Sequence, residues 1–186
     1  GAAMVALAKS AAETEQVRGA FQRLASQAGE SGDAIVKALQ RASAGTINQR
    51  DIMLSANRAM VLGVAQTTEQ FTALMEIARD RSRAMGITVQ QAFDNIVTGI
   101  GRASPLILDN LGITVDAVAA NKAYADSLGK SAESLTEAEK KQALLNAVLE
   151  QGGATLDRAG LAGRTSAEQF QVFAASVTEL KEQLGT

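Results

Sequence analysis

Two near-copies of one phrase divide this chain. "MGITVQQAF" at 85–93 and "LILDNLGITVDAV" at 106–118 share Gly-Ile-Thr-Val, and a new amphipathic run follows each. Glycine after a last helical turn adopts the left-handed conformation, the next apolar residue packs back on that turn, and threonine caps the following helix. The phrase therefore predicts a joint between two helices. Helices this short are unstable alone, so they must pack on one another.

Weaker signals of the same kind recur along the chain. Gly63 is followed by Thr67 and Thr68, and Gly129 by Ser131. Proline suits the first turn of a helix, where its missing N–H is not needed. A threonine with glutamate three residues later forms a capping box. The two glycines at 152–153 predict the end of the helix that this box starts. The predicted joint residues are Gly63, Gly86, Thr88, Pro105, Gly112, Thr114, Gly129, Thr136, Glu139 and Gly152.

The composition predicts an all-α fold. Aromatic residues make up only 3% of the chain, there is one proline, and no segment alternates with the period of a strand. The glycine stops are irregularly spaced, which argues against a regular solenoid. We expect a multi-helix bundle of short Gly-terminated helices between two longer terminal helices. The expected divisions are an N-terminal helix at 1–30, a compact helical module at 31–152, and a glycine-containing linker with a C-terminal helix at 153–186.

The last helix carries an apolar stripe. This helix is predicted to start at a capping box of Thr165 and Glu168. The sequence leaves two roles open for the stripe: it pairs with a second copy or a partner, or it closes the core of the module. Because the chain starts at Gly1 and ends in "ELKEQLGT", we expect an excerpt of a longer protein. The residues predicted for self-association are Phe170, Phe173, Val177, Leu180 and Leu184.

The residue types argue against catalysis and metal binding. Without histidine and cysteine, the chain lacks the usual general base, zinc ligands and thiol nucleophile. Glu137 and Glu139 fit the first turn of a helix, where the macrodipole favours carboxylates. We therefore predict no catalytic, cofactor-binding or metal-binding residues.

The charge pattern argues against nucleic acid and membrane partners. The net charge of −2 is evenly mixed, so no specific nucleic acid is expected. The densest basic patch, Arg79, Arg81 and Arg83, has Asp80 within it and is predicted to be a solvated helix face. No apolar run reaches the roughly 20 residues of a membrane span, so no transmembrane span is expected.

Longer stretches resemble a known family. They are "SGDAIVKALQRASAGTINQRDIMLSANRAMVLGV", "LMEIARDRSRAMGITVQQAFDNIVTGIGRASPLILDNLGITV" and "YADSLGKSAESLTEAEKKQALLNAVLEQG". Together they resemble, in the same order, a helical region of the tail tape measure proteins of long-tailed bacteriophages and prophages. The most specific pieces are "SPLILDNLGITV" and "LTEAEKKQALLNAVLEQG", and the resemblance covers about 31–152.

The resemblance implies a structural protein of the virion. Members of this family are long helical chains in the lumen of the phage tail, present in the host cytoplasm during assembly. They set the length of the tail tube and leave ahead of the genome at ejection. Their partners are the tail tube protein, tail-tip proteins and assembly chaperones, and a homo-oligomer is a further expectation. The joints suggest a folded module within the tape measure. The alternatives are a membrane-active, envelope-penetrating helical module and a cell-wall hydrolase module.

Overall fold

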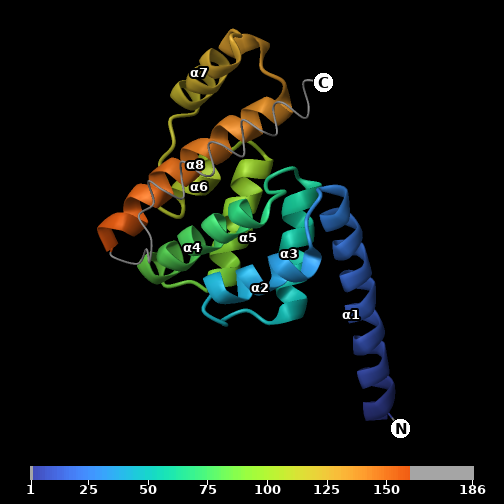
Figure 1. The fold of residues 1–186 in the computed structure, drawn as a ribbon. Helices are drawn as coiled ribbons and strands as arrows, with labels where there is room; N and C mark the ends of the chain where they lie inside the picture. Colours follow the sequence, from blue (N-terminus) through green and yellow to red (C-terminus); the bar gives the residue numbers. More distant parts are fainter. Residues whose placement is uncertain (1, 160–186) are drawn as a thin grey trace.

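The structure, a computed structural model, describes residues 2–159. Within this range the chain forms eight α-helices, one 3-10 helix and no strand (Figure 1), which confirms the predicted all-α bundle. The first and longest helix spans 26 residues, whereas most of the helices after it are half that length or less. The elements are α1 (Ala2–Gln27), α2 (Gly32–Ala42), α3 (Gln49–Val61), α4 (Thr68–Met85), α5 (Val89–Gly101), α6 (Pro105–Asp109), α7 (Ala117–Leu128), η1 (Ala132–Ser134) and α8 (Glu137–Ala159).

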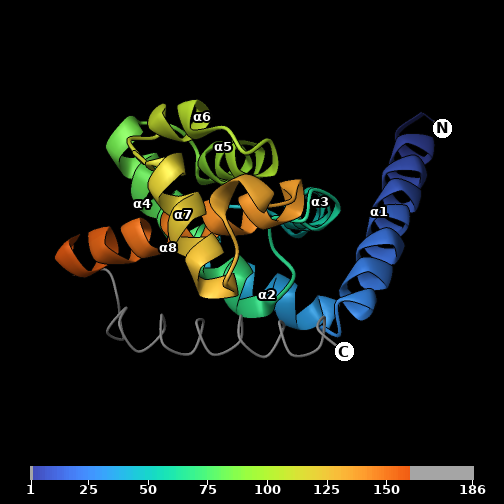
Figure 2. The ribbon, with the colours of Figure 1, turned by 90° about the horizontal axis from the view of Figure 1, so that it is seen from above.

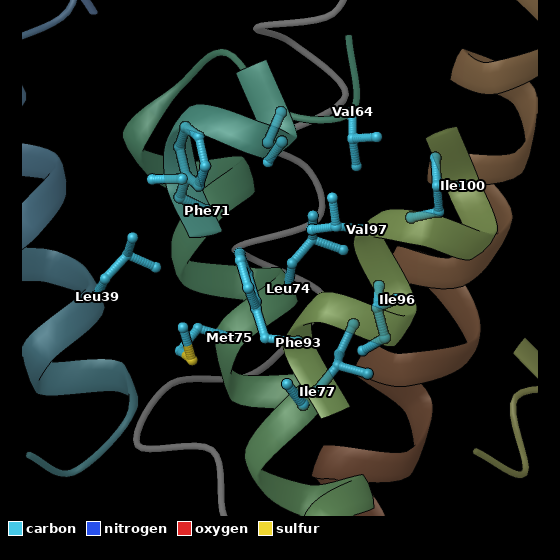
Figure 3. Close-up of a cluster of buried hydrophobic side chains, with 14 of the residues drawn as sticks. Leu39, Val64, Phe71, Leu74, Met75, Ile77, Phe93, Ile96, Val97 and Ile100 are labelled. Carbon is cyan, nitrogen blue, oxygen red and sulfur yellow. The ribbon is translucent and has the colours of Figure 1, made fainter. Parts of the chain in front are cut away.

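Helices α4 and α5 form the centre of the bundle. They pack on each other, α2 and α8 pack on α4, and α3, α6 and α8 pack on α5. Phe71 and Leu74 of α4 and Phe93 and Val97 of α5 lie in one cluster of fully buried side chains (Figure 3). Since the chain has few aromatic residues, this core is built largely from aliphatic side chains and alanine.

The first helix belongs to the bundle along only part of its length. Phe21 and Ala25, near its C-terminal end, are buried in the common core. Halfway along, Glu13 forms an ion pair with Arg50 of α3 at 3.7 Å. The N-terminal part projects away from the other helices in both views (Figures 1 and 2). The division predicted at residue 30 therefore separates two helices but not two cores.

The second predicted division falls inside a helix. We expected a stop at Gly152-Gly153, but α8 continues through both glycines to Ala159. The prediction was wrong because Gly152 serves a contact between helices. A Cβ atom at this position would lie 2.2 Å from Cδ1 of Ile77 in α4. The linker and final helix predicted beyond Ala159 lie outside the residues that the structure describes.

Candidate functional site: the helix joints

The joint between α4 and α5 is formed as the sequence predicts. Gly86 has φ of +67°, and the N–H of Ile87 donates to the carbonyl of Ser82 at 3.1 Å. Thr88 then caps α5, because its Oγ1 accepts from the N–H of Gln91 and the Gln91 side chain accepts from the N–H of Thr88, both at 3.1 Å. The whole turn takes three residues, so it joins the two central helices directly.

The second Gly-Ile-Thr-Val joint begins in the same way. Gly112 has φ of +69°, and the N–H of Ile113 donates to the carbonyl of Leu108 at 3.1 Å. The Ile113 side chain is buried in the main core. This joint therefore attaches the end of α6 to the bundle.

The second joint departs from the first after its threonine. We predicted that Thr114 caps the next helix, but the cap is Asp116, whose carboxylate accepts from the N–H groups of Val118 and Ala119 at 2.9 and 3.0 Å. The residue three positions after Thr114 is Ala117, which has no side-chain acceptor to complete a capping box. Instead, the Thr114 carbonyl accepts from Nε2 of Gln151 in α8 at 2.8 Å.

Apart from Gly152, the remaining predicted joints are present. Gly63 has φ of +68° and Gly129 has φ of +65°, so each ends its helix in the left-handed conformation. Pro105 is the first residue of α6. The Thr136 N–H donates to the Glu139 carboxylate at 2.7 Å, and the Glu139 N–H donates to the Thr136 hydroxyl at 3.2 Å, which completes the capping box at the start of α8.

Three glycines have a role that the sequence did not reveal to us. They lie inside helices and allow another element to approach closely. A Cβ at Gly99 would lie 2.7 Å from Leu108, and one at Gly101 would lie 2.9 Å from Leu62. At these two positions and at Gly152, an added Cβ would come closer than 3.0 Å to a neighbouring side chain. Glycine within a helical pattern was the available signal. It has a low helix propensity, so its presence inside a helix indicates a position where close packing requires it.

Two lysines form ion pairs with the glutamates at the start of α8. Nζ of Lys130 donates to the Glu139 carboxylate at 2.5 Å, and this bond, together with those from Thr136, lowers the pKa of Glu139 to about 2. A hydrogen bond from Lys140 lowers the pKa of Glu137 as well. Both carboxylates are therefore ionised and paired near neutral pH, as structural carboxylates are; a general acid would require a raised pKa.

The arginine cluster on α4 is less solvated than we predicted. Arg81 forms an ion pair with Asp80, and the two side chains are only 18% and 14% exposed. Arg81 also lies against the second joint, because a Cβ at Gly112 would be 3.7 Å from its guanidinium. Arg83 is exposed, as expected. Part of this basic patch therefore supports the fold.

The other predictions concern ligands, membranes and self-association. Across the residues described, no cluster of three acidic, histidine or cysteine side chains is placed to hold a metal ion, and none of the helices there is long and apolar enough to cross a membrane. The predicted self-association residues, Phe170 to Leu184, lie outside the described part. In comparisons with known proteins, no family model and no solved structure matches the chain.

Proposed function

We propose that this chain is a folded helical module of a tail tape measure protein. The observation that carries the proposal is the ordered series of stretches between residues 31 and 152 that resemble this family. The geometry of the joints supports a module with a structural role. Left-handed glycines and capping boxes fix short helices around one core, and the carboxylates of Glu137 and Glu139 are ionised and paired. The proposal assigns the chain no catalytic activity.

The dimensions favour an anchoring or assembly contact over a ruler. Laid out as one continuous helix, residues 31–159 would span roughly 190 Å at about 1.5 Å per residue. In the folded module, the longest helix among α2 to α8 has 23 residues, which corresponds to roughly 35 Å. A segment folded in this way contributes little length for its number of residues. We propose that it acts in the phage tail, assembled in the host cytoplasm, through contacts with tail tube protein, tail-tip proteins or chaperones.

Deletion of the module tests the proposal in the phage or prophage that encodes the chain. An in-frame deletion of residues 31–159 should leave few tails, or tails of unregulated length, in electron micrographs of lysates. Tails of uniform length that are shorter by roughly 190 Å would contradict a folded module and indicate a ruler. Tails normal in number and length would contradict the tape measure assignment itself.

A pair of substitutions separates folding from chain length. Gly152→Ala inserts a methyl group where α8 meets Ile77, and it leaves the chain length unchanged. It should reduce the number of tails without producing a uniformly shorter class. Thr114→Ala is the matched control, because the hydrogen bond of this residue is made by its backbone carbonyl. Tail counts reduced equally by both substitutions would contradict the proposed dependence on the folded module.

A further inference from the structure

Helix α7 lies at the edge of the bundle. It packs mainly on α8, and it is set apart from the central helices at the top of Figure 1. Residues 117–134, all of them described, contribute no side chain to the main core cluster. Ala125 is the one buried residue of α7, and Val118 is 79% exposed. The apolar contact that holds this helix is therefore small.

Polar contacts near α8 complete the attachment. Lys130, just after α7, reaches Glu139 at the start of α8, and the phenol of Tyr124 lies within reach of the charges of both residues. At the other end, the Thr114 carbonyl accepts from Gln151 of α8. Exposed ion pairs and single hydrogen bonds contribute little to stability. These contacts therefore set the position of α7 more than its stability.

We propose that residues 117–134, here called the flap, open from α8 as a unit while the rest of the bundle stays folded. Segments with few buried apolar contacts open locally at a free energy below that of global unfolding. The hinge at one end is the second joint, where Gly112 is already left-handed, and at the other it is the turn before the Thr136 capping box. Opening exposes Ala125 of α7, which is 1% exposed in the closed form. The module then has two forms that share one core.

The chain supplies its own probe for this motion. Tyr124 is the only tyrosine and there is no tryptophan, so tyrosine fluorescence reports on the flap alone. Far-ultraviolet circular dichroism reports on all the helices. In a urea titration of the whole 186-residue chain, the tyrosine signal should change at a lower urea concentration than the helical signal. Hydrogen exchange should show protection of the α7 amides that is roughly a hundredfold lower than in α4 and α5.

Two lysine variants provide the matched comparison. Lys130→Ala removes the contact with Glu139, so it should shift the tyrosine transition to lower urea and leave the helical transition in place. Lys122→Ala removes a pair with Asp126 that lies within α7, so it should move the tyrosine transition less than Lys130→Ala does. Coincident tyrosine and helical transitions in all three proteins, with uniform protection, would overturn the inference. Because these measurements use the isolated chain, their outcome is independent of the proposed role in the tail.

Discussion

Gly152 provides the strongest test of how the helices are packed. It lies in the middle of α8 where that helix meets α4, and a Cβ placed there would be 2.2 Å from Cδ1 and 2.4 Å from Cγ1 of Ile77. Non-bonded carbon atoms are at their best separation at about 3.5–4.0 Å. Ile77 is 2% exposed and packed in the core, so it has little room to withdraw. Gly152→Ala must therefore move the isoleucine or separate the two helices.

The sign of the effect follows from two opposed contributions. Alanine improves helix propensity over glycine by about 1 kcal/mol. Overpacking a core typically costs about 1–3 kcal/mol, and the high end applies here because Ile77 has one strongly preferred rotamer in a helix. We expect Gly152→Ala to lower the free energy of unfolding by about 1–2 kcal/mol.

A second glycine within a helix provides the control. In α1, a Cβ at Gly19 would meet only Nη1 of Arg23, at an ordinary 3.6 Å. Gly19→Ala should therefore raise the free energy of unfolding by up to about 1 kcal/mol. Urea denaturation followed by circular dichroism measures both changes. If Gly152→Ala stabilised the chain as Gly19→Ala does, the close contact with Ile77 would be refuted.

The coupling between the two residues adds an independent measurement. In an Ile77→Ala background the atoms that crowd Gly152 are absent, so Gly152→Ala should cost less than it does in the parent chain. A double-mutant cycle isolates this difference because the two residues are in contact. Additive effects would mean that the clash is not with Ile77.

Three smaller predictions concern the joints and the flap. Thr88→Ala should destabilise the chain by about 1 kcal/mol because a helix cap is lost. Thr114→Ala should change the free energy of unfolding by less than about 0.5 kcal/mol. Equal losses of stability in urea denaturation would contradict the caps described. The pKa of Glu139 is lowered to about 2, so its stabilising contribution is present above its unfolded pKa and is lost as the pH falls through 2. The urea midpoint of the tyrosine signal should therefore decrease as the pH is lowered from the unfolded pKa of Glu139 to about 2, and it should decrease less in Glu139→Gln. Equal pH dependence in the parent chain and in Glu139→Gln would contradict the pairing. Burial, with the nearby charge of Glu139, raises the pKa of Tyr124, so closure of the flap weakens as the pH rises from about 10 through the folded pKa. Ultraviolet titration of the tyrosine should give a higher midpoint in the folded chain than in the chain unfolded by urea. Equal midpoints would contradict the burial of Tyr124.

The helix ends could be predicted from the sequence because their causes are local. A left-handed glycine, the apolar residue after it and a capping threonine occupy neighbouring positions, and this is how Gly86 and Thr88 were identified. The error at Thr114 was avoidable, since Ala117 three residues later cannot complete a capping box. The error at Gly152 has a different origin. Its role depends on Ile77, which is distant in the sequence, so a glycine that ends a helix and one that admits a neighbouring helix look alike before the fold is known.

The candidate site was predictable to a similar extent. The joints at Gly63, Gly112 and Gly129 and the capping box of Thr136 were found from spacing alone. The close contacts at Gly99 and Gly101 were missed, because each depends on a leucine from outside α5. The peripheral position of α7 was missed too. Its alanine-rich sequence resembles that of buried helices, and only the packing reveals that Val118 faces solvent.

The two roles of glycine affect how the module could be straightened. Turning its helices into one rod requires the joint glycines to change from the left-handed to the right-handed conformation, which glycine does without a steric penalty. The caps at Thr88 and Asp116 would lose their hydrogen bonds, at a cost of about 1 kcal/mol each. The main resistance is therefore the core shared by α1 to α6 and α8. The flap lies outside that core, so it can swing out first, and extension of the remaining helices requires the core to be broken.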